Sequence, residues 1–225
     1  MRHTWTRRGV LQAAGGLTAL SLRARGASQP TSDVMVKIST YMAGARDRAL
    51  PKEATEATKD HILDTFAAMV SGSELAPGKF AMGFARGHEG EKVATVAGSN
   101  VVCGAMEAAF ANAMMAHADE TDDSHAPSQS HPGCGIVPAA LAVSEQLGID
   151  GNRFLRAVAV GYDIGTRVTM ALGVSAFQTE THISSHALAS LFGGAAAAAS
   201  AAGLSAAQMR WVLDYAAQQA SGTKA

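Results

Sequence analysis

The chain has 225 residues, of which 48% are hydrophobic, 16% charged and 5% aromatic, and its formal net charge is −1. This composition is ordinary for a soluble protein with one sizeable core or two smaller ones. Nucleic-acid binding is excluded, because phosphate recognition needs a concentrated positive surface and no basic cluster follows the first 25 residues. The two cysteines, Cys103 and Cys134, are too few for a disulfide framework or an iron–sulfur cluster.

The first 30 residues differ in kind from the rest of the chain. Arg7 and Arg8 precede an apolar run over residues 10–22, and Arg23 and Arg25 follow it. A run of 13 residues is too short to cross a bilayer as a helix, which needs about 20, so no permanent membrane anchor is expected. The pattern predicts a twin-arginine signal region over residues 1–30 and a periplasmic location. The alternative is the basic N-terminus of a cytoplasmic protein.

Abundant alanine and scarce aromatics favour closely packed helices over sheets. Ser32 can cap a first helix. A second starts at Pro51, presents one apolar stripe and ends near Gly72. A short helix is expected within residues 76–90, and residues 92–99 form a brief extended piece. Residues 104–118 are apolar nearly all round and predict a buried helix. The stripe of the second helix consists of Ile62, Leu63, Phe66, Ala67 and Val70.

The second half of the chain also predicts helices. One is expected over residues 138–147, before Gly148, and Asp150 caps the next, over residues 153–172. The alanine-rich residues 192–203 suit a central helix that neighbouring backbones approach closely. Ser205 and Gln208 form a capping box for residues 206–220. The prediction is therefore an all-α, multi-helix domain over residues 31–225 with little or no β structure.

Residues 117–133, "HADETDDSHAPSQSHPG", hold three histidines and four carboxylates, and no Lys or Arg lies between Val93 and Asn152. Mutual repulsion should raise the pKa of at least one carboxylate if the loop is partly buried. A carboxyl group of raised pKa and a histidine form an acid–base pair near neutral pH. Pro132 and Gly133 would fix the turn that presents His131. The stretch therefore favours proton transfer.

Two other interpretations of this stretch stay open. A metal could bind nitrogen and oxygen ligands from it, with a second pair at spacing i, i+4 on one helix face. That pattern lacks the glutamate of the helical protease motif, so we predict no metal or other cofactor. A solvated acidic loop is the second interpretation. For Cys134, a small buried hydrophobe is favoured over a nucleophile. The candidate ligands are His117, Asp119, His125 and His131, with His182 and His186 as the pair.

Three motifs, in this order and spacing, carry a resemblance to a known family. They are "HADETDDSH…SHPGCGIVPAALA", "GYDIGTRV" and "FGGAAAAASAAGLSAAQMRWVLDYAAQQASG". The chain resembles, from about Ser32 to Gly222, the first half of the MmgE/PrpD family, which includes 2-methylcitrate dehydratase, cis-aconitate decarboxylase and iminosuccinate epimerase. The resemblance implies a helical domain joined to a smaller α+β domain, dimers, no iron–sulfur cluster, and proton or carboxylate transfer on small di- and tricarboxylates.

The resemblance also implies site residues in the acidic stretch. His131 matches the family histidine before Pro-Gly or Pro-Ser, an acid–base or substrate-orienting residue. Glu120 stands where the family has an aspartate, and its extra methylene shifts the carboxylate by more than about 1 Å. Asp122 and Asp123 match the aspartate pair. Ser124 replaces the usual threonine and is expected to bind substrate.

Two further site residues follow from the later motifs. The second family histidine falls by ungapped count on Ser184, between His182 and His186, and His186 is preferred. Arg167 matches the arginine of "GY-x-x-G-x-R" and would bind a substrate carboxylate or form a buried structural ion pair.

Relatives are about twice as long, and the substrate-gripping lysines and tyrosine come from their second half. The expectation is thus a truncated or split lyase-type member acting on a small polycarboxylate such as 2-methylcitrate, with little activity alone. The alternative is a non-catalytic remnant or binding partner that keeps the helical half only. A metal-dependent hydrolase is a third possibility, which stoichiometric zinc or manganese would support.

Overall fold

The computed structural model describes residues 31–88 and 90–220. The expected signal region, residues 1–30, lies outside these described residues. The chain divides into two units, Met1–Val34 and Met35–Ala225. The fold is that of the second unit, and helix α2 (Asp33–Ala45) begins just before it.

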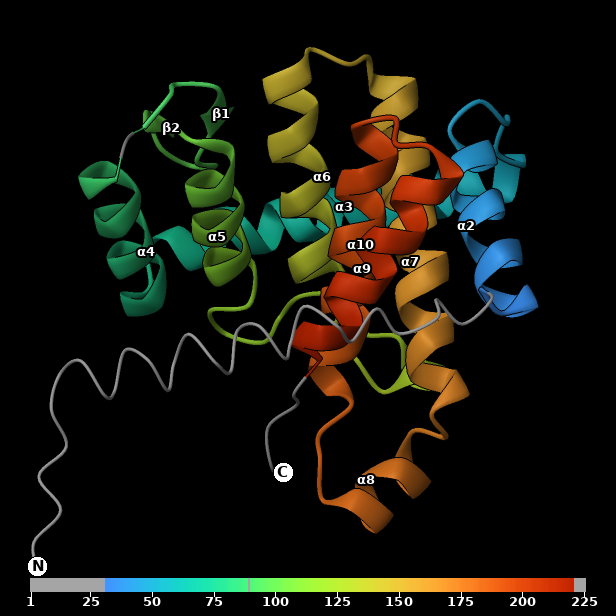
Figure 1. Cartoon of the computed structure of the whole chain (residues 1–225). Coiled ribbons are helices and arrows are strands. Elements are labelled where there is room, and N and C mark those ends of the chain that lie inside the picture. Colours follow the sequence, from blue (N-terminus) through green and yellow to red (C-terminus); the bar gives the residue numbers. More distant parts are fainter. Residues whose placement is uncertain (1–30, 89, 221–225) are drawn as a thin grey trace, which may run out of the picture. The chain divides into compact units, whose positions relative to one another are not determined.

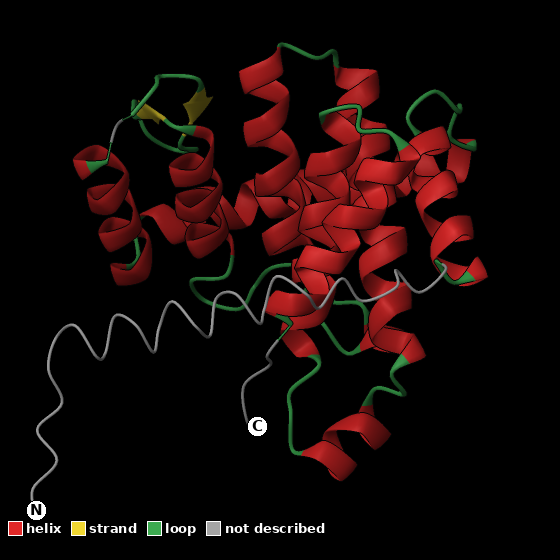
Figure 2. Cartoon of the chain, viewed as in Figure 1, coloured by secondary structure: helices red, strands yellow, loops and turns green. Residues whose placement is uncertain are grey.

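The described residues form an all-α fold with one small β hairpin, as the sequence predicts (Figures 1 and 2). Strands β1 (Ala94–Thr95) and β2 (Val102–Cys103) are antiparallel, with Ala94 opposite Cys103 and Thr95 opposite Val102. The remaining helices are α3 (Lys52–Ser73), α4 (Ala76–Gly87), α5 (Ala105–Ala116), the short 3₁₀ helix η1 (Ala126–Ser128), α6 (Gly133–Leu147), α7 (Gly151–Ala171), α8 (Ser175–Thr181), α9 (His186–Ala201) and α10 (Ala206–Gln219).

Several helix ends are set by the local signals in the sequence. The Asp150 side chain accepts a hydrogen bond from the backbone N–H of Arg153 at 3.0 Å and caps α7. Ser205 and Gln208 form the expected capping box of α10. Gly148 ends α6 with a φ of 61°, a left-handed conformation that glycine adopts without strain. These predictions are confirmed.

Helix α6 begins at Gly133, five positions before the predicted start at residue 138. Pro138 therefore lies inside the helix rather than in its first turn. Proline inside a helix removes one hydrogen bond, a loss that packing can offset. Helix α6 packs against α5, α7 and α9, and its residues Ile136, Val137 and Pro138 are buried. Tertiary contacts thus extend α6 toward the N-terminus, beyond the start that Pro138 suggests.

The apolar faces of two helices differ from the expected ones. In α3, Leu63 and Val70 are 71% and 55% exposed, whereas Thr65 and Met69 are buried. Helix α5 was expected to be buried all round, but Met106 is 80% exposed. It packs against α3, α4 and α6, which cover only part of its circumference. The predicted stripe of α3 and the all-round burial of α5 are therefore wrong in part, because the neighbouring helices decide which face is covered.

Two hydrophobic clusters form the core of the unit from Met35 onward. The first cluster contains residues of α3, α4, α5, α6 and the hairpin, and Met69, Met115 and Ile136 lie in it. The second joins α2, α7, α9 and α10 around Met42 and Met209. Helix α9 packs against α6, α7 and α10, which confirms its predicted central place.

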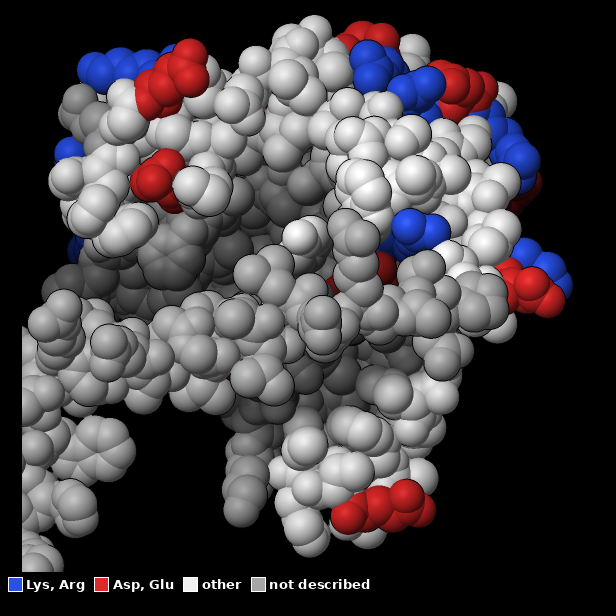
Figure 3. Space-filling model, viewed as in Figure 1, with Lys and Arg blue, Asp and Glu red and all other residues white. Residues whose placement is uncertain are grey.

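No helix within the described ranges is long and apolar enough to span a bilayer. On the face drawn in Figure 3, Lys and Arg side chains mostly lie next to Asp and Glu side chains.

Candidate active site

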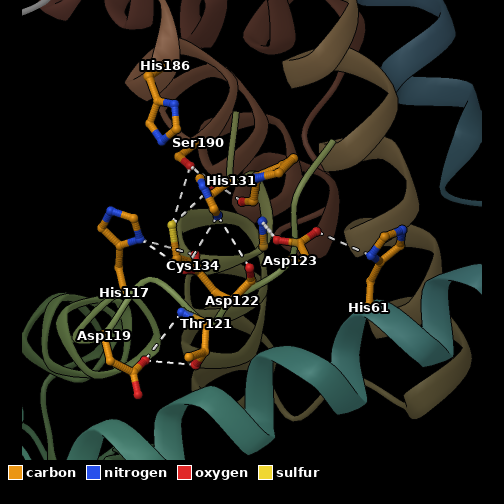
Figure 4. Close-up of polar contacts among 12 residues, drawn as sticks. His61, His117, Asp119, Thr121, Asp122, Asp123, His131, Cys134, His186 and Ser190 are labelled. Carbon is orange, nitrogen blue, oxygen red and sulfur yellow. Dashed lines mark hydrogen bonds and ion pairs between the residues drawn. The ribbon is translucent and has the colours of Figure 1, made fainter. Parts of the chain in front are cut away.

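The rings of three histidines from separate elements lie close together, and two of them contact the carboxylate of Asp122 (Figure 4). His117 is the C-terminal cap of α5, and His131 lies directly before Pro132 at the start of α6. His186 is the first residue of α9. The ring centroids of His131 and His186 are 4.9 Å apart, those of His117 and His131 5.5 Å, and those of His117 and His186 6.4 Å. Helix ends far apart in sequence therefore deliver one imidazole cluster.

The aspartate at this cluster is Asp122, whose side chain is fully buried. His117 Nδ1 lies 3.1 and 3.2 Å from its two carboxylate oxygens. His131 Nδ1 lies 3.6 Å from Asp122 Oδ1. A buried carboxylate is costly unless it is paired and hydrogen-bonded, and here the imidazoles supply the partners.

Backbone carbonyls fix the tautomers of two of these histidines. His131 Nδ1 lies 3.3 Å from the backbone oxygen of Asp122, and His186 Nδ1 lies 3.1 Å from that of Gln129. A carbonyl oxygen can only accept, so each Nδ1 must carry a proton and donate it. In a neutral ring this leaves the Nε2 lone pair free. His131 and His186 can therefore both take up a proton through Nε2.

The neighbouring Asp123 belongs to a second network. Its Oδ1 accepts the backbone N–H of Gly133 at 2.8 Å, and its Oδ2 accepts the Tyr162 hydroxyl at 2.7 Å. His61 Nδ1, on α3, lies 3.2 Å from the same Oδ2. The His61 ring stacks on Tyr162, with centroids 4.5 Å apart. Asp123 thus binds the first turn of α6, which follows His131.

The second network changes the pKa values of its members. Burial opposes ionisation of Asp123, but the hydrogen bonds from His61, Tyr162 and Gly133 outweigh it and hold the pKa of the carboxyl below its usual value. The hydrogen bond to Asp123 raises the pKa of His61, although burial opposes the shift. Burial, together with the charge of Asp123, raises the pKa of Tyr162. The network is therefore stable as an imidazolium and a carboxylate.

Cys134 lies in the first turn of α6, beside the histidines. Its thiol donates to the backbone oxygen of His131 at 3.2 Å, and the Ser190 hydroxyl donates to the same oxygen at 2.8 Å. Burial raises the pKa of Cys134 to about 12. A thiol with this pKa is protonated at neutral pH and is a poor nucleophile, which favours the buried, structural interpretation of Cys134.

A comparison with models of protein families shows to which family this chain belongs. The model of the MmgE/PrpD N-terminal domain matches residues 36–225. The chain belongs to the MmgE/PrpD family. This family contains dehydratases and other lyases. A search among curated proteins gave no significant match.

The structure of this MmgE/PrpD chain brings together three of the predicted site residues: His131, His186 and Asp122. Asp123 lies next to them but points into the His61 network (Figure 4). Glu120 and Ser124 are exposed and make no hydrogen bond to any residue in the described ranges. Glu120 has a φ of 56°, a left-handed conformation that is uncommon for residues other than glycine.

Arg167 forms an ion pair with Asp163 one turn earlier on α7, at 2.5 Å. Its side chain is 71% exposed, so a buried structural ion pair, one of its two predicted roles, is wrong. Arg167 lines a depression of about 730 Å³ between α2, α7, α9 and α10, whose lining includes none of the clustered histidines. Its role in substrate binding stays a prediction.

The structure bears on two further expectations, one about the carboxylates and one about the histidine pair. The pKa of Asp119 is lowered by the Thr121 hydroxyl and that of Asp123 by its network, so a raised carboxyl pKa is not found at these two residues and stays a prediction for the stretch. His182 and His186 do not share a helix face, because His182 caps the end of α8 and three residues separate it from α9. The gap breaks the expected i, i+4 pair.

His117, Asp122 and Cys134 could hold a metal, since one ligand atom from each lies within 4.8 Å of the others. Nitrogen, oxygen and sulfur together suit a borderline ion such as Zn²⁺. Binding would have to displace the thiol proton and the hydrogen bond of His117 to Asp122. Without a metal, His117, Asp122 and Cys134 already have hydrogen-bond partners within the protein.

Sequence reasoning missed His61, Tyr162 and Ser190. Tyr162 stands inside the quoted "GYDIGTRV" motif, which could have marked it as a candidate. His61 lies between Asp60 and Asp64 on an otherwise ordinary helix, and no local signal ties it to Asp123.

Proposed function

We propose that the imidazole cluster is the acid–base half of a lyase-type site for small di- or tricarboxylates, such as 2-methylcitrate. The observation that carries the proposal is the pair of tautomer-fixed rings, His131 and His186, 4.9 Å apart. Each presents an Nε2 atom that can accept a proton from a substrate or, once protonated, donate one.

In a dehydration, one Nε2 takes the proton from the carbon next to a substrate carboxylate. The electron pair of that C–H bond forms the double bond, and the hydroxyl on the adjacent carbon leaves. The second imidazole, protonated, gives its proton to the departing oxygen, which leaves as water. Asp122 stabilises the positive charge on His117 and His131 as they are protonated. Decarboxylation or epimerisation would use the same proton-handling pair.

The charges of the cluster support an anionic substrate of this kind. The Asp122 carboxylate is already paired with an imidazole, and the Asp123 carboxylate is paired with an imidazole and a phenol. Protonated histidines of the cluster can therefore attract a substrate carboxylate. By the family resemblance, we propose that the remaining cations come from an α+β half. On the same grounds we propose that the protein works as a homodimer and, from the paired arginines, that it is exported.

Thermal unfolding of the complete gene product with 2-methylcitrate and with cis-aconitate tests the proposal. A ligand at 100 times its Kd stabilises a protein by about 2.7 kcal/mol, which raises the melting temperature by several degrees. We expect such a shift with at least one acid, and its loss in His131→Gln. His88→Gln, which changes an exposed histidine on the C-terminal cap of α4, should keep it.

If neither acid raises the melting temperature of the folded product, the lyase proposal fails and the non-catalytic remnant is favoured. Activity that survives exhaustive chelation would exclude the metal-dependent hydrolase.

A further inference from the structure

We propose that His61 is a positioning residue for His131: by holding the Asp123 carboxylate against the backbone N–H of Gly133, it fixes the turn that presents the His131 ring. The proposal rests on the proposed function only in giving His131 a chemical task, because the mechanical link itself concerns contacts in the free protein.

The link has two hydrogen bonds, one on each oxygen of Asp123. Gly133 N–H binds Oδ1 at 2.8 Å, and His61 Nδ1 binds Oδ2 at 3.2 Å, beside the Tyr162 hydroxyl (Figure 4). Because different donors hold the two oxygens, the carboxylate cannot rotate freely. The positive end of α6 adds to the attraction for its negative charge. The Asp123 side chain therefore links His61 to the first residue of α6.

The space around Gly133 is narrow, and Asp123 forms one of its walls. A Cβ added at Gly133 would lie 2.5 Å from Asp123 Oδ1, 2.6 Å from the Tyr162 hydroxyl and 2.7 Å from Thr65 Oγ1. Only glycine fits at these distances, so the turn lies directly against side chains of α3 and α7. On the other side, Ser190 binds the His131 carbonyl at 2.8 Å. The His131 turn is held between these two contacts.

The charges around His61 favour its protonated form. Asp123 contributes most, and Asp60 and Asp64 on α3 act in the same direction, while burial opposes them. The His61 side chain is 40% exposed, so bulk protons reach it. The bond to Asp123 is strongest for the imidazolium and weakens as pH rises through the raised pKa of His61.

Other groups around His61 come from two more elements. Tyr162 and Asp163 on α7, together with His125 before η1, line the same open depression of about 280 Å³. Tyr162 has a raised pKa and stays neutral, and Asp163 is paired with Arg167. A charge on His125 would disfavour protonation of His61. The side chain of His125 accepts the backbone N–H of Ser128 and the ring packs on its own turn.

NMR hydrogen exchange on the intact chain tests the link without any substrate. His61→Phe keeps a ring to stack on Tyr162 but removes the donor, whereas His61→Gln keeps an N–H donor. We expect exchange of the Gly133 amide to speed up by about tenfold or more in His61→Phe, since a hydrogen bond to a charged group is worth about 1.5–3 kcal/mol. His61→Gln should restore most of the protection, and the His131 ring signals should move with it.

His88→Phe is the matched control, because His88 also stacks on an aromatic ring, Phe84, with centroids 4.2 Å apart. It should leave Gly133 and His131 unchanged. Unaltered Gly133 exchange in a folded His61→Phe protein would overturn the proposal, and so would an equal change in His88→Phe. If His61→Phe does not fold, a wild-type pH titration decides: the Gly133 amide must shift with the same midpoint as the His61 ring. Substrate binding plays no part here, so a negative thermal-shift screen leaves this test intact.

Discussion

At the scale of single residues, Asp122 and Asp123 are adjacent in sequence but have different partners. Asp122 is bound by His117 and lies near His131, whereas Asp123 is bound by His61, Tyr162 and the start of α6. Each carboxylate is buried and each has its own imidazole. The aspartate pair therefore has two tasks: one carboxylate stabilises charge on the histidines, and the other holds the turn that presents them.

Asp123→Asn tests the second task through the pH dependence of stability. The folded pKa of Asp123 lies below the unfolded value of 3.8, so its ionised form stabilises the fold above pH 3.8, and this contribution is lost as pH falls through the lower folded pKa. We expect the variant to lose about 1.5–3 kcal/mol of unfolding free energy at pH 7 and to show a weaker decline in acid. Urea unfolding between pH 7 and pH 2 measures both. Equal acid sensitivity of variant and wild type would contradict this account.

At the scale of elements, small residues let α7 and α9 pack backbone to backbone. A Cβ added at Gly161 would lie 2.8 Å from the Gly193 carbonyl oxygen, and one at Gly193 would lie 2.7 Å from the Gly161 carbonyl oxygen. The contact is reciprocal, so neither helix can take up a methyl group without moving. His186 begins α9 and Tyr162 lies on α7, so this packing also sets the distance between the two networks.

Gly161→Ala and Gly83→Ala should therefore change stability in opposite directions. Alanine is favoured over glycine in a helix by about 1 kcal/mol. At Gly83, in α4, nothing lies within 4 Å of the added Cβ, so the gain should appear in full. At Gly161 the clash with α9 should outweigh it and destabilise the protein by about 1–3 kcal/mol. Thermal unfolding of both variants measures the signs, and stabilisation by Gly161→Ala would mean that the helices are not closely packed.

At the scale of the whole molecule, the unit from Met35 onward has two hydrophobic clusters that share helices. Helix α7 contributes Val158 to the first cluster and Val160 to the second. Helix α9 contributes Ala197 to the first and Ala196 to the second. Because the same helices would have to leave both clusters, we expect the two to unfold together.

Met69→Ala and Met209→Ala test this cooperativity, one in each cluster. Met69 is 0% and Met209 1% exposed, so each truncation should cost about 2–5 kcal/mol. Hydrogen exchange followed by mass spectrometry should show α5 and α10 losing protection together in both variants. Loss confined to α5 in Met69→Ala and to α10 in Met209→Ala would show two independent folding units.

The sequence by itself determined the helices, several of their ends and the family. Capping residues such as Asp150 and Ser205 act within three residues, and apolar periodicity acts within one helix, so these signals can be read locally. The acidic stretch before His131 was also identified from its composition. Helix faces were less certain, because coverage depends on neighbours, as exposed Leu63 shows.

The tertiary structure alone decided which polar groups meet. His186 binds Gln129 across 57 positions, and Tyr162 binds Asp123 across 39. No local pattern encodes such pairs, because they depend on how α3, α7 and α9 pack against the loop between α5 and α6. The tautomers of the histidines follow from the same contacts, since a ring nitrogen donates or accepts according to the atom that packing places beside it.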